Sequence, residues 1–256
     1  VGLTYLTNPP GQQLLGYGFS LTDHLSGLAG ALATVEAVEY KRRTGQGLDI
    51  DLAQYELGLG IMAPALLHYL ANGDNPQPVG NWHPWDAWAP HGIYPCEGDD
   101  AWAAIAVRGD EEWRTFCDVI GQRALADDPR FATHQARLQR RVAIDVIISN
   151  WTCQRDPYTV MDACQRKGIA AGVVQNASHL AHSDSQLEAR RFFGTASCER
   201  WGEYGVDRFP ARFNGERPPV YEGVHELGAD TFDVLHGILG FDDATIAELV
   251  SCGALT

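Results

Sequence analysis

A glycine-containing turn that leads directly into a long helix constrains this chain more than any other feature. Residues 16–24 read Gly-Tyr-Gly-Phe-Ser-Leu-Thr-Asp-His, and the residues that follow contain no proline and carry apolar side chains at helical spacing. The pattern predicts a helix over Leu25–Tyr40 with Thr22 or Asp23 as its N-cap. There the Asp23 carboxylate faces unpaired backbone N–H groups and the positive end of the helix dipole, which favour its charged form. An ionised Asp23 can serve as a helix cap or as a nucleophile.

The residues after this helix predict a break and then a second helix. Basic residues precede Gly45, which fits the helix C-cap, and the alternation over 48–52 predicts a short strand. Apolar spacing predicts a helix over 52–70, and polar breakers at 72–76 mark a boundary after it.

The rest of the chain alternates strand and helix patterns, which is typical of an α/β fold. A strand is expected over 101–107, followed by a helix that Asp110 caps. Further helices are expected over 140–151 and 158–167, a turn and strand over 168–174, and a final helix pair over 231–239 and 243–252.

Several short motifs, each different, follow one another along nearly the whole chain. They are Asp23 with Ser26-Gly27, Arg43-Thr44-Gly45-Gln46-Gly47, Gly80-Asn81-Trp82-His83, Ala89-Pro90-His91-Gly92-Ile93-Tyr94, Asp128-Pro129-Arg130-Phe131-Ala132-Thr133, Gly168-Ile169-Ala170-Ala171-Gly172-Val173 and Leu227-Gly228-Ala229-Asp230. Together these motifs resemble the class III CoA transferases, a family that includes formyl-CoA transferase, carnitine CoA-transferase and benzylsuccinate CoA-transferase.

The resemblance implies that Asp23 is the acyl-accepting nucleophile of a CoA transfer between an acyl-CoA and a carboxylic acid. The expected intermediates are a mixed anhydride and then an aspartyl-CoA thioester, and covalent catalysis of this kind divides the exchange into easier steps. Coenzyme A and its thioesters are then substrates, and no permanently bound cofactor is expected. The active-site loop implied by the resemblance contributes Gly80, Asn81, His83, His91, Gly92 and Tyr94.

The resemblance also implies the architecture. The expected fold is the carboxyl-terminal part of the class III CoA transferase fold, an incomplete Rossmann-like large domain with a smaller α/β domain, and the complete enzyme is expected to form an interlocked dimer. The expected segments are part of the large domain with the nucleophile helix at 1–72, a linker and active-site loop at 73–100, the small domain at 101–199, and a return to the large domain at 200–256.

The chain departs from the family in two respects. Family members often place a glycine-rich loop where residues 80–92 here carry three tryptophans, which either pack under the linker or contact substrate. The family's amino-terminal half, which supplies most contacts to CoA, has no match here. We therefore expect a fragment, or a homodimer or heteromer in which another chain supplies that half, and no CoA-binding residue is named.

Charge and composition exclude several other functions. The net charge of -14 disfavours nucleic acid and anionic membranes as partners, and no apolar run is long enough for a membrane span. Six scattered cysteines without a C-x-x-C pair and nine histidines without an i, i+4 pair flanking an acid favour reduced thiols and no metal site. Reduced thiols and the lack of a signal peptide favour the cytoplasm.

Two alternatives to a transferase stay open. An acyl-CoA racemase or epimerase of the same superfamily uses an aspartate at the position of Asp23 for α-proton transfer. A non-catalytic subunit of a heteromeric enzyme would keep Asp23 as a helix cap.

Overall fold

A computed structural model describes residues 2–198, 200–220 and 223–255. The chain forms two compact units, Val1–Val174 and Gln175–Thr256. This division falls inside the segment 101–199, and the segment boundaries given above remain predictions.

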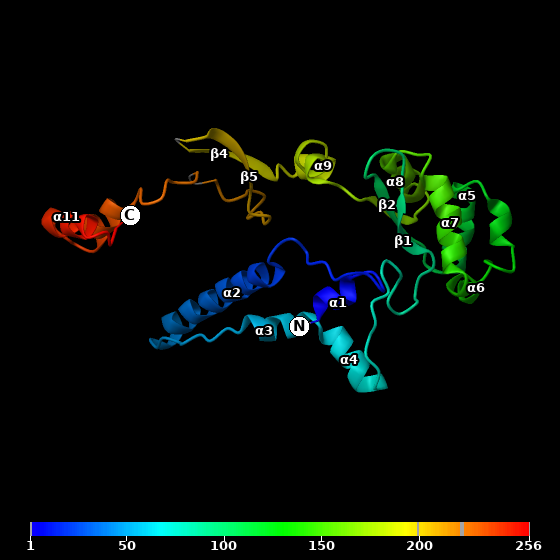
Figure 1. Ribbon diagram of the computed structural model, residues 1–256, viewed down its shortest axis with the longest axis horizontal. Helices are drawn as coiled ribbons and strands as arrows, with labels where there is room; N and C mark the ends of the chain where they lie inside the picture. The colour runs from blue at the N-terminus through cyan, green and yellow to red at the C-terminus, as the bar shows by residue number, and fades with distance from the viewer. Residues whose placement is uncertain (1, 199, 221–222, 256) are drawn as a thin grey trace. The chain divides into compact units, whose positions relative to one another are not determined.

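The first unit begins with four helices (Figure 1). These are α1 (Leu3–Thr7), α2 (Leu21–Thr44), α3 (Gln54–Ile61) and α4 (Ala63–Asn72). Helix α2 ends at Gly45 as predicted, because Gly45 adopts φ 77° and donates its N–H to the Lys41 carbonyl at 2.8 Å. Helix α4 ends in the same way at Gly73, with φ 79°.

Three local predictions in this region are wrong. Helix α2 begins at Leu21 with Ser20 as its N-cap, so Asp23 is the third helical residue instead of the cap. The segment 48–52 forms no strand, because no neighbouring strand among the described residues pairs with it. The helix expected over 52–70 is two helices that meet at Met62.

The first unit continues with a small antiparallel sheet and the helices that cover it (Figure 1). Its elements are β1 (His91–Pro95), β2 (Trp102–Ala106), α5 (Gly109–Val119), the 3₁₀ helix η1 (Arg123–Ala126), α6 (His134–Gln139), α7 (Arg141–Thr152), α8 (Pro157–Gln165) and β3 (Ala170–Val173). The strand order is β1-β2-β3, with His91 opposite Ala106 and Ala106 opposite Ala170. Arg108 is the N-cap of α5, so the prediction that Asp110 caps this helix is wrong.

One face of this sheet holds the core. Helix α7 packs on β1, and α8 packs on β2 and β3. Ala103 and Ile105 of β2 are buried, as are Ile144 and Ile148 of α7, which are one helical turn apart. Because side chains alternate along a strand, Ala104 and Ala106 lie on the opposite face of β2. That second face lines the pocket described below.

The second unit has little buried apolar surface. It contains α9 (Ala177–His182), α10 (Ser185–Ala189), the antiparallel hairpin of β4 (Phe193–Cys198) and β5 (Gly202–Asp207), the π-helix η2 (Asp233–Ile238) and α11 (Asp243–Ser251). The predicted final helix pair corresponds to η2 and α11. Within the described part of this unit, Ala196 and Ile246 are the buried hydrophobic side chains.

Candidate active site

The carboxylate of Asp23 is exposed in the first turn of α2. The backbone N–H groups of Asp23 and His24 both donate to the Ser20 carbonyl, at 3.1 and 3.2 Å, so the turn closes through the backbone. The His24 Nδ1 also lies 2.9 Å from the Ser20 carbonyl oxygen and donates to it. His24 is therefore occupied in closing the helix start, and the Asp23 side chain is left to make other contacts.

Gln54 is the residue that holds the Asp23 carboxylate. Its side-chain amide Nε2, at the first position of α3, donates to Asp23 Oδ1 and to Thr22 Oγ1, the latter at 3.1 Å. An amide N–H aimed at a carboxylate orients it without neutralising its charge. Sequence reasoning missed Gln54, because it lies 31 residues from Asp23 and no local pattern connects the two.

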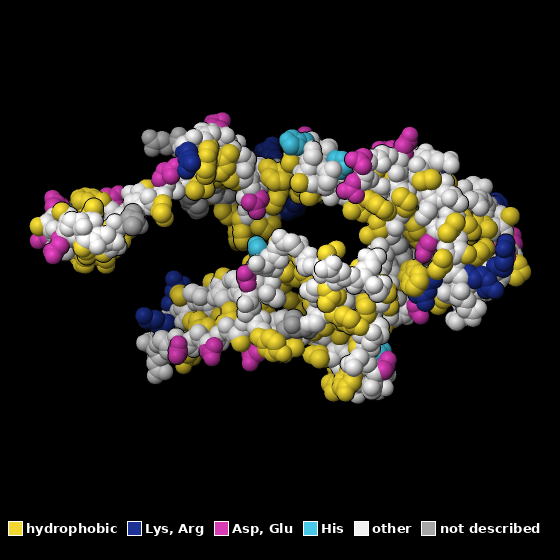
Figure 2. Space-filling model, viewed as in Figure 1, with side chains coloured by type: hydrophobic (Ala, Val, Ile, Leu, Met, Phe, Trp, Pro, Cys, Tyr) yellow, Lys and Arg dark blue, Asp and Glu magenta, His cyan; other side chains and the backbone are white. Residues whose placement is uncertain are grey.

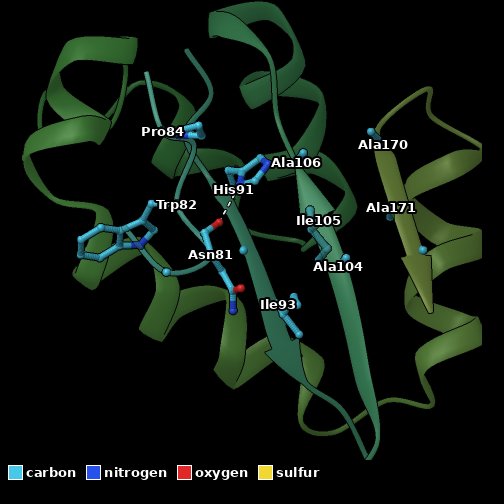
Figure 3. Close-up of a pocket in the computed structure, with 13 residues that line it drawn as sticks. Asn81, Trp82, Pro84, His91, Ile93, Ala104, Ile105, Ala106, Ala170 and Ala171 are labelled. Atoms are coloured by element: carbon cyan, nitrogen blue, oxygen red, sulfur yellow. Dashed lines mark hydrogen bonds between the residues drawn. The ribbon is translucent and has the colours of Figure 1, made fainter. Parts of the chain in front are cut away.

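A second group of predicted residues surrounds a pocket of about 610 Å³ on the open face of the sheet (Figure 3). Gly80, Asn81, His91 and Gly92 line it, and its floor consists of small apolar residues of β2 and β3, among them Ala104, Ala106, Ala170 and Ala171. The His91 Nδ1 donates to the Asn81 backbone carbonyl at 2.6 Å, the bond drawn as a dashed line in Figure 3. This bond joins the loop to β1 at the edge of the pocket.

His83 is part of an aromatic cluster next to this pocket and does not line the pocket itself. Its ring lies 4.9 Å from the Trp88 ring and 5.5 Å from the His91 ring, measured between centroids. The His83 Nδ1 accepts from the backbone N–H groups of Trp85 and Ala87, both at 3.3 Å. Burial and the neighbouring His91 lower the pKa of His83, although Asp86 opposes them. A neutral His83 is the form that can accept both bonds.

Tyr94 is buried and turns toward α7 instead of the pocket. Its hydroxyl donates to Asp145 Oδ1 at 2.9 Å, while Trp82 Nε1 donates to Asp145 Oδ2 at 3.0 Å. Burial, followed by the nearby Asp145 charge, raises the pKa of Tyr94 well above its usual range. Asp145 therefore fixes a tryptophan of the loop and a tyrosine of β1 together, a role that sequence reasoning did not find.

Gly92 is explained by the same arrangement. A Cβ at this position would lie 2.9 Å from the Tyr94 ring and hydroxyl, closer than ordinary van der Waals contact. Only glycine lets the Tyr94 ring lie across β1 toward Asp145.

Arg137 and Arg141 make structural contacts. Arg137 is fully buried and donates to the carbonyls of Ala89 and Phe131, at 2.8 and 3.1 Å, and to Asp110 Oδ1 at 2.9 Å. Arg141 pairs with Asp86 at 3.0 Å and lies over the Trp82 ring. Trp82 thus packs between the loop and α7, whereas Trp85 is 62% exposed. Packing under the linker therefore applies to Trp82, and contact of a tryptophan with substrate stays a prediction.

The structure brings the predicted residues together in two groups. The loop residues surround the sheet pocket, and Asp23 lies with Gln54 at the α2–α3 contact; Asp23 does not line that pocket. Within residues 2–198, 200–220 and 223–255, no group of three or more His, Cys, Asp or Glu side chains is placed to hold a metal ion. Over the same described residues, no helix has the length and apolar character needed to span a bilayer.

Comparison with known proteins decides the family. The model of CoA-transferase family III matches residues 1–231. The chain belongs to this family. A probable CoA-transferase of Mycobacterium tuberculosis is 34% identical over 67% of this chain and 21% of its own length. The alpha subunit of succinyl-CoA–L-malate CoA-transferase from Chloroflexus aurantiacus is 26% identical over 98% of this chain and 58% of its own length.

A solved structure of similar fold supports the same assignment. The CAIB/BAIF family protein from Brucella suis matches with a TM-score of 0.80 and 26% identity, over 97% of this chain and 60% of that chain. The first curated relatives are longer proteins, since the chain covers 21%, 46% and 61% of their lengths. This family member therefore corresponds to part of each of those proteins.

Proposed function

We propose that this chain is the nucleophile-bearing portion of a carboxylate CoA transferase, with Asp23 as the acyl carrier. The observation that carries the proposal is the exposed Asp23 carboxylate, in the first turn of α2 and hydrogen-bonded by Gln54, in a chain that belongs to CoA-transferase family III. The names of the relatives support transfer of CoA between an acyl-CoA and a carboxylic acid.

The chemistry follows from a carboxylate that attacks a thioester. A carboxylate oxygen of Asp23 forms a bond to the acyl carbonyl carbon, and the carbon–sulfur bond breaks to release CoA thiolate. The thiolate then attacks the Asp23 carbonyl of the mixed anhydride, which releases the first acid and leaves an aspartyl-CoA thioester. The acceptor carboxylate repeats these steps in reverse, so Asp23 is regenerated and the exchange is balanced without another reactant.

The position of Asp23 in α2 leaves its carboxylate open to a substrate. Asp23 is the third helical residue and is exposed in the first turn. The Gln54 amide donates a directed hydrogen bond to it from α3. This contact does not remove the charge, so the carboxylate stays available for attack.

We assign the sheet pocket to a part of the substrate away from its reacting carbonyl, because Asp23 does not line the pocket. Its alanine-rich floor on β2 and β3 is apolar, and Asn81 and His91 at its edge supply polar atoms. The loop residues Gly80, Asn81, His83, His91 and Gly92 then shape this pocket, and Tyr94 supports it from behind through Asp145. The donor and acceptor acids are carboxylates, with succinyl-CoA among the donors named for relatives.

We propose that a further polypeptide segment, from the same or another chain, covers α2. Its apolar side chains are exposed, with Leu28, Leu32 and Val35 at 62–66%, and Figure 2 shows hydrophobic side chains over the helices of this region. Large exposed apolar patches mark interaction surfaces. The alpha-subunit relative supports a heteromer. A homodimer with interlocked chains is the arrangement expected from the family resemblance, and the cytoplasm is the location expected from the pattern of cysteines.

Trapping of the intermediate tests the proposal. The protein, together with any natural sequence that precedes residue 1, is incubated with a panel of acyl-CoAs and then with hydroxylamine, and intact and peptide masses are measured. A hydroxamate at Asp23 in the wild type, and none in Asp23→Ala, supports the transferase. The matched control Asp51→Ala removes another exposed carboxylate and should leave labelling unchanged.

The remaining outcomes separate the alternatives. No adduct with any donor, combined with α-proton exchange in deuterated water, would identify a racemase. If neither an adduct nor proton exchange is detected, the chain is a non-catalytic subunit.

A further inference from the structure

A pocket lined by five arginines lies entirely within the second unit. Its volume is about 470 Å³, and its lining includes one carboxylate, Glu216. The arginines come from the α10–β4 turn and from the segment after β5; they are Arg190, Arg191, Arg208, Arg212 and Arg217. The whole chain has only 19 lysines and arginines and a net charge of -14, so this pocket concentrates positive charge in an acidic protein.

Backbone carbonyls hold these side chains in place. The Arg190 carbonyl accepts from Arg212 and from Arg217 Nη2, the latter at 3.3 Å, and the Phe209 carbonyl accepts from Arg217 Nη1. Arg190 Nη2 in turn donates to the Pro210 carbonyl at 3.2 Å. These bonds fix the guanidinium groups but use few of their donors, because each guanidinium carries five N–H groups. They also leave the positive charges uncompensated, since a carbonyl carries no net charge.

Arg208 reaches the pocket across strand β4. A Cβ on Gly194 would lie 2.9 Å from the Arg208 Cδ, so glycine is what lets the arginine stem pass over the strand. Arg208 Nη2 donates to the Pro218 carbonyl at 3.3 Å. Its Nε is buried, and no described residue accepts a hydrogen bond from it. A buried N–H without an acceptor is costly, and a bound anion would supply the acceptor.

Positive charges lie close together in the pocket. Burial, and then the charges of Arg212, Arg190 and Arg208, lower the pKa of Arg217. Among the residues that the structure describes, no carboxylate forms an ion pair with any of these arginines. Guanidinium groups that are held close together in this way bind anions with charge-assisted hydrogen bonds.

We propose that this pocket binds the linked phosphate groups of a small molecule. Phosphate suits the site better than a single carboxylate, because a tetrahedral group accepts hydrogen bonds from several directions and the arginines approach from different segments. Several positive charges also match the multiple negative charges of linked phosphates. The volume accommodates a diphosphate together with part of an attached group.

Calorimetric titration of the chain with inorganic pyrophosphate at low ionic strength tests this site. The wild type should bind with a measurable Kd that rises steeply with salt. Arg212→Gln should weaken binding by about tenfold or more, since it removes one charge-assisted donor from the pocket. Arg114→Gln removes an exposed arginine of α5 outside the pocket and should leave the Kd within about twofold.

A second variant distinguishes loss of the binding site from loss of folding. Glu216→Gln removes the carboxylate from the pocket lining and should tighten pyrophosphate binding, a gain that an unfolded protein does not produce. Adenosine triphosphate and coenzyme A, titrated in parallel, distinguish a free nucleotide from a CoA ester as the source of the phosphates.

Three results would overturn the proposal. They are the absence of pyrophosphate binding at millimolar concentration, an equal loss in Arg212→Gln and Arg114→Gln, and weaker binding in Glu216→Gln. Dissociation of an oligomer in Arg212→Gln, with no pyrophosphate binding by the wild type, would assign the pocket to an acidic segment of a polypeptide instead.

Discussion

Replacement of Asp145 by alanine tests whether this carboxylate positions the loop. The substitution removes two hydrogen bonds, from the Tyr94 hydroxyl at 2.9 Å and from Trp82 Nε1 at 3.0 Å. A hydrogen bond to a charged group contributes about 1.5–3 kcal/mol. Loss of the bond from the buried Tyr94 costs most of this free energy, because the hydroxyl is left without an acceptor. Loss of the bond from the half-buried Trp82 costs about 1 kcal/mol, because its N–H can bond to water instead. Alanine regains about 0.5 kcal/mol through its helix propensity.

The expected net loss is about 2–3 kcal/mol in the free energy of unfolding. Urea denaturation measures it, and hydrogen exchange should show faster exchange of the amides in residues 80–92 in the same variant. Asp162→Ala is the matched control. Asp162 lies on α8 in an exposed ion pair with Arg166, at 3.3 Å, and its loss should cost at most about 1 kcal/mol.

A double-mutant cycle decides whether the loss comes from the Tyr94 contact. Tyr94→Phe should cost about 1–2 kcal/mol in the wild type and under about 0.5 kcal/mol when Asp145 is already alanine, because its acceptor is then gone. If the two losses simply add within about 0.3–0.5 kcal/mol, Asp145 does not hold Tyr94 and the reasoning is wrong.

Other features of the same unit give three simpler predictions. Gly92→Ala should destabilise by about 1–3 kcal/mol, because its Cβ would overlap the Tyr94 ring at 2.9 Å; Gly172→Ala, where a Cβ has open space, should change the urea midpoint far less. The lowered pKa of His83 means that the unfolded chain binds protons more readily. Stability is therefore full above the unfolded pKa of about 6.5 and falls as the pH drops through it, a dependence that urea midpoints should show and that His83→Gln should reduce. Burial raises the pKa of Cys117 to about 12, so iodoacetamide at neutral pH should label it only after unfolding, as peptide mass spectrometry can determine.

Local patterns predicted the elements that local physics decides. Gly45 ends α2 because a glycine in the left-handed conformation closes the last turn. A glycine directly after basic residues is visible in the sequence, so this helix end was predictable. The strand expected over 101–107 is β2, since alternating burial of Ala103 and Ile105 is the pattern of a strand with one face on a core.

Patterns failed where a partner far along the chain decides the structure. Residues 48–52 alternate like a strand, yet an alternating segment becomes a strand only when another strand pairs with it. Asp145 contacts Trp82 and Tyr94 across 63 and 51 residues, and no spacing rule connects positions so far apart. The motifs therefore indicated residues that the structure gathers around one pocket, although their role in a reaction stays a prediction. The residues that support the motifs were not predictable in this way.

Gln54 is the supporting residue whose replacement bears most directly on the proposed reaction. Its amide donates to the Asp23 carboxylate, so Gln54→Leu should lower the rate of acyl transfer to Asp23 by about tenfold while the KM for acyl-CoA changes little, because Gln54 positions the nucleophile. Gln54→Glu places a second carboxylate beside Asp23 and should lower the rate further, with partial recovery as the pH falls and the new side chain takes up a proton. Rapid-quench measurement of the Asp23 adduct across a pH series separates these effects. Identical rates and pH profiles for the two variants would mean that Gln54 only holds α3 against α2, since a purely structural role does not depend on the charge of the replacement.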